Sequence, residues 1–145
     1  MPTITPAADP LSRLLRLLQS SLSMYIADSG IWSYPGAEEI KLSLVDLVGD
    51  QRNIVERAGA ILEERDVAAS GHGYPLSFSA LHDIDLGFLL PRIVADLRRQ
   101  VGDIDALIEA AGDDPAALEL AREARGTTLG HIDVLAPLAN RPGHS

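Results

Sequence analysis

The sequence predicts an all-α protein built as a single four-helix bundle, and three observations favour that fold class. The hydrophobic fraction is 46% but aromatic residues make up only 4%, so the apolar content is mostly Leu, Ala, Ile and Val. A composition rich in Leu and Ala suits helices better than sheets, which favour β-branched and aromatic residues. Apolar residues recur in four stretches at alternating intervals of three and four residues, the spacing of a helix-bundle core. A chain of 145 residues is long enough for one domain with its own core.

The charge balance and the absence of cysteine exclude several classes of function. The chain has 12 basic and 21 acidic residues and a net charge of −9, which opposes binding to a phosphate backbone or an anionic membrane. We therefore expect neither a nucleic acid nor a membrane partner. Without cysteine there is no disulfide, no thiolate catalysis and no Cys-ligated metal. Because residues 1–10 show no signal peptide, we predict a cytoplasmic protein.

The bundle is predicted to occupy residues 11–138, between a flexible N-terminal arm (1–10) and a C-terminal tail (139–145). Pro10 suits the first turn of a helix, and Tyr34-Pro35-Gly36 stops that helix. Between them one apolar stripe runs without interruption, which predicts a single first helix. The stripe consists of Leu11, Leu15, Leu18, Leu22, Tyr25, Ser29 and Trp32.

The second helix is predicted from about Ala37 to Arg65, and a long connection follows it. In residues 74–78, large apolar side chains alternate with smaller residues, which predicts an extended strand-like segment. Fully extended, a connection of about 17 residues reaches roughly 50 Å at about 3.3 Å per residue. A 28-residue helix is only about 42 Å long. The third helix can therefore start beside the start of the second and run parallel to it.

The third helix is predicted to begin at Asp83 or Asp85, since either can cap it. Pro91 predicts a kink, because the apolar stripe continues on both sides of it. Asp113 or Asp114 opens the fourth helix after a short turn, and Pro137 and the tail from Asn140 end the chain. Short connections thus join the first and last helix pairs, and one long crossover joins the second helix to the third.

This helix order, together with two segments of sequence, resembles the ferritin-like superfamily. Residues 130–135 read Gly-His-Ile-Asp-Val-Leu and are similar to the last helix of bacterioferritins, where a Glu-x-x-His pair precedes Ile-Asp-Trp-Leu. Glu56-Arg57 followed by Ile61-Leu62-Glu63 resembles the second helix of that family. Tyr74-Pro75-Leu76 and Leu89-Leu90-Pro91 are similar to segments of uncharacterised ferritin-like bacterial proteins.

The resemblance implies a di-iron site, but the ligands of that site are missing here. In the metal-bearing members two helices each supply a Glu and two supply a Glu-x-x-His pair. This chain has Thr128 three residues before His131, and Gln51 and Ile54 in the second helix. Shifting that helix by one residue gives Asp50 and Asn53, which point away from the core by helical phase. The di-iron site is therefore expected to be degenerate or absent.

A polar layer is predicted across the middle of the bundle, because one polar residue of each helix falls at a similar height. It could bind a small polar ligand, or it could be a buried amide network that fixes helix register. His131 is the best single metal ligand, or else a core histidine hydrogen-bonded to a glutamine of the layer. Asp96 could approach the layer from its edge, but it is expected rather on the surface, paired with Arg92 or Arg99. The layer consists of Gln19, Gln51, Gln100, Thr128 and His131.

Two functions follow as hypotheses. The first is a non-enzymatic protein without cofactor that acts as a homodimer or adaptor. Leu14, Leu17 and Ile31 fall off the main stripe of the first helix and predict an apolar dimer face on the first two helices. The second is a metal-dependent oxidoreductase or iron-handling protein, with iron or manganese in a remodelled site near His131.

Overall fold

The computed structural model describes residues 9–68, 74–81 and 84–140, and all regular structure in these residues is helical. The all-α prediction is therefore confirmed. Residues 1–8 of the predicted arm and 141–145 of the predicted tail lie outside the described residues. The elements are α1 (Pro10–Gln19), α2 (Leu22–Ser29), the 3₁₀ helix η2 (Ile31–Ser33), α3 (Glu38–Glu64), the 3₁₀ helix η3 (Leu76–Leu81), α4 (Leu86–Ala111) and α5 (Pro115–Ala139).

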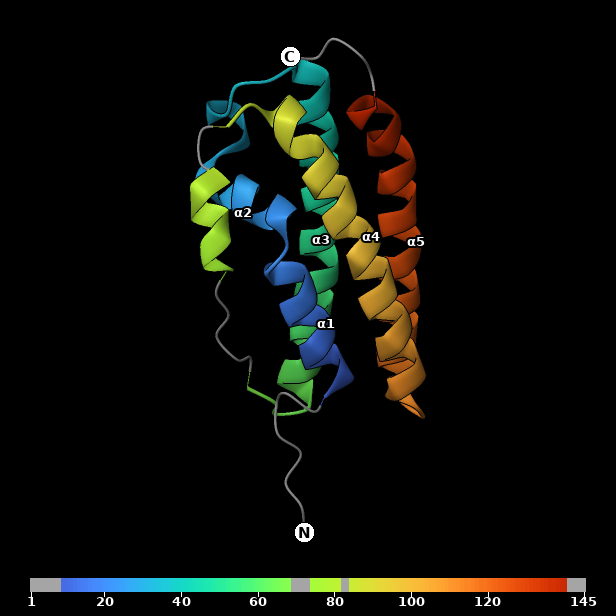
Figure 1. Cartoon of the computed structure of the whole chain (residues 1–145). Coiled ribbons are helices and arrows are strands. Elements are labelled where there is room, and N and C mark those ends of the chain that lie inside the picture. Colours follow the sequence, from blue (N-terminus) through green and yellow to red (C-terminus); the bar gives the residue numbers. More distant parts are fainter. Residues whose placement is uncertain (1–8, 69–73, 82–83, 141–145) are drawn as a thin grey trace.

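The helices lie along one common axis, and the long connection returns along the length of the bundle. Figure 1 shows α3 and α4 running in the same direction, with α1 and α5 running the opposite way. The backbone N–H of Leu86, at the start of α4, donates to the carbonyl of Pro35, just before α3, at 2.8 Å. The starts of α3 and α4 therefore meet at one end, as expected from the length of the crossover.

The predicted first helix is divided in two at Ser20 and Ser21, so the prediction of one continuous helix is wrong. The Ser20 hydroxyl donates to the carbonyl of Arg16 at 2.8 Å, and the Ser21 hydroxyl accepts from the N–H of Met24 at 3.2 Å. Serine side chains compete in this way with the backbone ladder and start a new helix. Figure 1 shows α2 turning away from the axis of α1.

The segment predicted to be extended is helical instead. Phe78 is buried and its ring lies 5.5 Å from the Tyr25 ring, whereas Leu76 is 91% exposed. In a strand these two residues would share one face. In a 3₁₀ helix, with three residues per turn, they point in different directions. The alternation of apolar residues therefore does not reflect the two-residue period of a strand. It falls on a 3₁₀ helix with three residues per turn.

The predicted caps of the last two helices lie where the sequence placed them. Asp85 accepts from the N–H of Gly87 at 2.7 Å, and Asp114 accepts from the N–H of Ala117 at 3.1 Å. After α4, Gly112 adopts a φ of 59°, the left-handed conformation that favours glycine. Pro137 lies inside α5, which continues to Ala139.

One arginine joins three elements at the end of the bundle where α5 starts. Arg65, just after α3, donates to both carboxylate oxygens of Asp114 at 2.8 Å and to Asp9, the cap of α1, at 3.2 Å. The Arg65 guanidinium holds the pKa of Asp114 below its usual value, and the N–H of Ala117 adds to this effect. The ends of α1, α3 and α5 are thereby held together.

The apolar core of the described residues forms two clusters, one toward each end of the bundle. The cluster near the start of α3 includes Leu44, Leu90 and Leu135. The cluster near the end of α3 includes Leu15, Ile104 and Ala121. None of the helices in the part of the chain that the structure describes is both long and apolar enough to cross a membrane.

Candidate functional site

Buried polar residues lie between the two apolar clusters. Gln51 of α3, Gln100 of α4 and Thr128 of α5 are all buried. On each helix the polar residue follows the last member of one cluster and precedes the first member of the other. The flanking pairs are Leu47 and Ile54 on α3, Leu97 and Ile104 on α4, and Ala124 and Ile132 on α5. The structure therefore places these three residues in one layer across the bundle.

The junction of α1 and α2 completes this layer with residues that the sequence did not single out. Ser23 donates to Oε1 of Gln51 at 2.9 Å, and the hydroxyls of Ser21 and Ser23 are 3.2 Å apart. Both serines are buried. Gln19 ends α1 and is only partly buried, and no hydrogen bond among the described residues joins it to the layer. The signal available in the sequence was the pair of serines, of which Ser21 caps α2.

Asp96 is the charged centre of the layer. It is only 8% exposed, so the expectation of a surface residue is wrong. Its Oδ2 accepts from the N–H of Leu22 at 3.1 Å and from Nε2 of Gln100 at 3.3 Å, and its Oδ1 pairs with Arg99. The first N–H of α2 thus donates to a carboxylate, at the helix end where the dipole favours negative charge. Arg99 is one of the two arginines predicted to pair with Asp96.

Two atoms in the layer lack hydrogen-bond partners among the described residues. They are the donor Nε2 of Gln51 and the acceptor Oε1 of Gln100, and both are fully buried. A buried polar group without a partner costs about 1–3 kcal/mol. Buried water or a small polar ligand is the usual partner of such groups. Thr128 does not supply one, because its hydroxyl donates to the carbonyl of Ala124 in its own helix at 2.6 Å.

His131 lies at the rim of the layer and pairs with a carboxylate, not with a glutamine. Its Nε2 is 2.6 Å from Oδ2 of Asp50 on α3. The His131 side chain is 15% exposed and the Asp50 side chain 54% exposed. Arg57 and Glu123 form a second pair along the same edge at 2.7 Å. Asp50 and Arg57 lie off the apolar stripe of α3 and contact α5 across this edge. Helical phase within α3 alone does not predict these contacts.

The rim pair provides two potential metal donors, one imidazole nitrogen and one carboxylate. Among the described residues, no group of three or more His, Cys, Asp or Glu side chains is arranged to hold a metal ion. Asp96 lies elsewhere in the layer and has Leu22, Gln100 and Arg99 as partners. A di-iron centre requires several carboxylates together with imidazoles, a larger donor set than this pair.

The predicted apolar dimer face on the first helix does not exist as described. Leu14 and Ile31 are buried, and Leu17 is partly buried against the core. They belong to the interior because α1 and α2 are separate helices with different orientations. The large apolar side chains that the described structure exposes are Trp32, Leu42, Val45, Leu76, Phe88, Leu129 and Val134.

Comparison with known proteins gives no relative for this chain. No family model, no curated protein and no solved structure matches it. The ferritin-like assignment therefore stays a prediction, based on helix order and on segments such as residues 130–135.

Proposed function

We propose that this chain is a ferritin-like helical bundle that acts through protein contacts, first of all as a homodimer. The observation that supports the proposal is a set of exposed apolar side chains toward one end of α3 and α5: Leu42 and Val45 on α3 and Val134 on α5. These side chains are 50%, 42% and 53% exposed. Val45 lies about 140° around α3 from Asp50, away from the α5 edge, so Leu42 and Val134 are the residues near the shared edge. Large aliphatic side chains left open to solvent on adjacent helices are typical of partner-binding surfaces. We call Leu42 and Val134 the α3–α5 surface.

The two edge contacts explain why these residues lie at the same end of the α3–α5 edge. His131 meets Asp50, and Glu123 meets Arg57, so the two helices run antiparallel along this edge. Leu42 precedes Asp50 on α3 and Val134 follows His131 on α5. Both positions therefore lie beyond the polar layer, on the side where α3 begins.

The backbone beside the α3–α5 surface is open to close approach. Gly49 on α3 and Gly130 on α5 are exposed, and a Cβ atom added to either would meet no atom within 4 Å. A helix from a second copy can therefore lie close to this edge without side chains in its way. The proposed dimer uses α3, as predicted, but α5 takes the place of the first helix.

Oligomeric state measured by size-exclusion chromatography with light scattering tests the proposal. We expect a dimer for the unmodified chain and a shift toward monomer for Leu42→Arg and Val134→Arg, with at least tenfold weaker association, or about 1.4 kcal/mol. Leu76→Arg is the matched control, because Leu76 is exposed and apolar but lies on η3. A monomeric unmodified chain, or equal weakening by all three variants, would contradict a dimer through the α3–α5 surface.

The contact between His131 and Asp50 favours a second candidate, a metal-dependent oxidoreductase or iron-handling protein. Its two donors are 2.6 Å apart at a solvent-exposed edge, where iron or manganese would complete its coordination with water or substrate. Metal content after ferrous iron loading and gel filtration separates the candidates. Near-stoichiometric metal that is lost in His131→Ala but kept in Asp133→Ala would favour this candidate. Equal retention by both variants, or none in the unmodified chain, would contradict it.

A further inference from the structure

A cleft lies between α4 on one side and η3 with the start of α2 on the other. Its volume is about 460 Å³, within the range of about 300–1,000 Å³ typical of small-molecule sites. The α4 wall carries Arg92, Ala95 and Arg99 above the buried Asp96, and the opposite wall is largely apolar. We call it the α4 cleft. The residues of the opposite wall used below are Leu22, Pro75 and Phe78.

The two departures from the predicted fold form this cleft. Ser21 caps α2 and thereby places Leu22 at its edge. The 3₁₀ turn of η3 directs Phe78 inward, where its ring contacts those of Tyr25 and Tyr74 at centroid distances of 5.5 and 6.3 Å. The apolar wall is thus supported by packed aromatic rings.

The α4 cleft carries surplus positive charge in an acidic protein. The Asp96 carboxylate already accepts hydrogen bonds from Leu22 and Gln100 and pairs with Arg99. Arg92 has no ion-pair partner among the residues that the structure describes. Elsewhere in the described chain four arginines pair with carboxylates, and four do not, namely Arg13, Arg16, Arg98 and Arg122. These paired arginines are Arg52, Arg57, Arg65 and Arg125.

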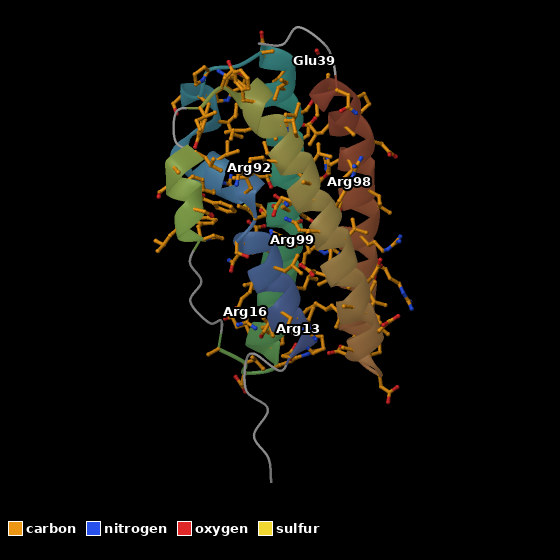
Figure 2. All side chains as sticks on the ribbon, viewed as in Figure 1. Arg13, Arg16, Glu39, Arg92, Arg98 and Arg99 are labelled. Carbon is orange, nitrogen blue, oxygen red and sulfur yellow. The ribbon has the colours of Figure 1, made fainter. Side chains whose placement is uncertain are left out.

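The positions of the arginines distinguish the two sides of α4. Arg92 and Arg99 are seven residues apart and therefore lie on one face of the helix. Figure 2 shows them on the side of α4 toward α2 and α1, whereas Arg98 lies on the side toward α5. Arg98 instead borders a separate depression shared with Ala136 and Ala139 of α5. The surplus charge of the cleft therefore comes from Arg92.

We propose that the α4 cleft binds a small organic carboxylate with an aromatic or branched aliphatic body. The carboxylate lies on the guanidinium of Arg92, whose planar donors match two carboxylate oxygens, and Arg99 adds a second positive charge. The body packs against the exposed Pro75 and against the edges of Phe78 and Leu22, which are 7% and 2% exposed. Inorganic phosphate would satisfy Arg92 but leave the apolar wall uncovered. This inference concerns a different surface from the proposed dimer and does not depend on it.

Titration of the full-length protein with phenylacetate, followed by amide NMR and calorimetry, tests the proposal. We expect saturable binding, with shifts concentrated at residues 22, 75–78 and 92–99. Arg92→Gln should weaken binding at least tenfold, and Ala95→Leu should weaken it by filling the cleft without changing charge. Arg98→Gln is the matched control and should bind as the unmodified chain does. Arg92 and Arg98 are both exposed, so neither substitution is expected to disturb folding, which circular dichroism checks.

Neutral and truncated probes separate the two parts of the site. Phenylacetamide keeps the ring without the charge, and acetate keeps the charge without the ring, so both should bind at least tenfold more weakly than phenylacetate. Equal binding of phenylacetamide, or equal weakening by Arg92→Gln and Arg98→Gln, would overturn the proposal. Absence of saturable binding for both phenylacetate and 4-methylpentanoate would overturn it as well.

Discussion

Each side of the polar layer has an aspartate, but one carboxylate is buried and the other is exposed. Where α2 meets α4, Asp96 is 8% exposed and accepts from a backbone N–H, an amide and a guanidinium. Where α3 meets α5, Asp50 is 54% exposed and has His131 as its partner. The buried carboxylate holds the start of α2 against α4. The exposed one leaves its pair accessible to solvent, metal or a partner chain.

Burial decides how much each carboxylate contributes to folding. A buried charge loses several kcal/mol of hydration, and only a full set of donors offsets that loss. Removing the carboxylate then leaves those donors without partners, each at about 1–3 kcal/mol. An exposed pair contributes about 0–1 kcal/mol, because water screens it and competes for both groups. Substitutions on the two sides should therefore differ severalfold in their effect on stability.

The largest effect is expected for Asp96→Ala. It removes the acceptor of the Leu22 N–H and of Nε2 of Gln100, both in the buried layer. We expect the free energy of unfolding to fall by about 2–4 kcal/mol, measured by urea denaturation followed by circular dichroism. Asp105→Ala is the control, because Asp105 pairs with Arg125 on the surface and should cost less than about 1 kcal/mol.

Similar decreases in the free energy of unfolding for Asp96→Ala and Asp105→Ala would mean that water replaces Asp96 as the acceptor of the Leu22 N–H. The buried and exposed sides would then not differ as argued. The α4 cleft, which borders Asp96, is the route by which such water would enter.

A smaller effect of opposite sign is expected for Gln51→Met. The substitution removes the buried Nε2 that has no partner among the described residues, and also the acceptor of the Ser23 hydroxyl. Losing the unpartnered donor gains about 1–3 kcal/mol and losing the hydrogen bond costs about 1 kcal/mol. We expect a net stabilisation of about 1 kcal/mol by urea denaturation. The double variant Ser23→Ala/Gln51→Met should be at least as stable, because it removes the remaining hydroxyl.

A clear loss of stability in Gln51→Met would instead show that Nε2 has a partner in solution. That result would favour the interpretation of the glutamine layer as a binding site for a small polar ligand.

The helices and most of their ends could be predicted because each depends on local signals. Asp85 and Asp114 cap α4 and α5 through their own neighbours in sequence. Gln51 interrupts a regular apolar stripe and Gln100 lies beside one, so helical phase alone predicts their burial. The ligand role assigned to them stays untested.

The features that escaped prediction depend on contacts between distant segments. The apolar stripe of the first helix continues across Ser20 and Ser21, so its period gives no sign of the break. The break is stabilised by Asp96, which lies 74 residues from Leu22. Asp50 was expected to point away from the core by phase, and it does lie at the exposed edge. Its contact with His131, 81 residues away, follows from how α5 packs on α3.

The smallest effect is expected for Asp50→Asn. The amide oxygen can still accept a hydrogen bond from His131, so only the charge of an exposed pair is lost. We expect a change in the free energy of unfolding of at most about 0.5 kcal/mol, with Asp133→Asn as a control, because Asp133 is exposed on α5 but is turned about 200° from His131 around the helix. The measurement is most informative at both low and high protein concentration, because the pair lies beside the α3–α5 surface. A loss above about 1.5 kcal/mol that appears only at high concentration would mean that a second copy covers the pair and removes its water. The same loss at both concentrations would show that the α3–α5 edge is desolvated within one chain, and the contrast with Asp96 would then fail.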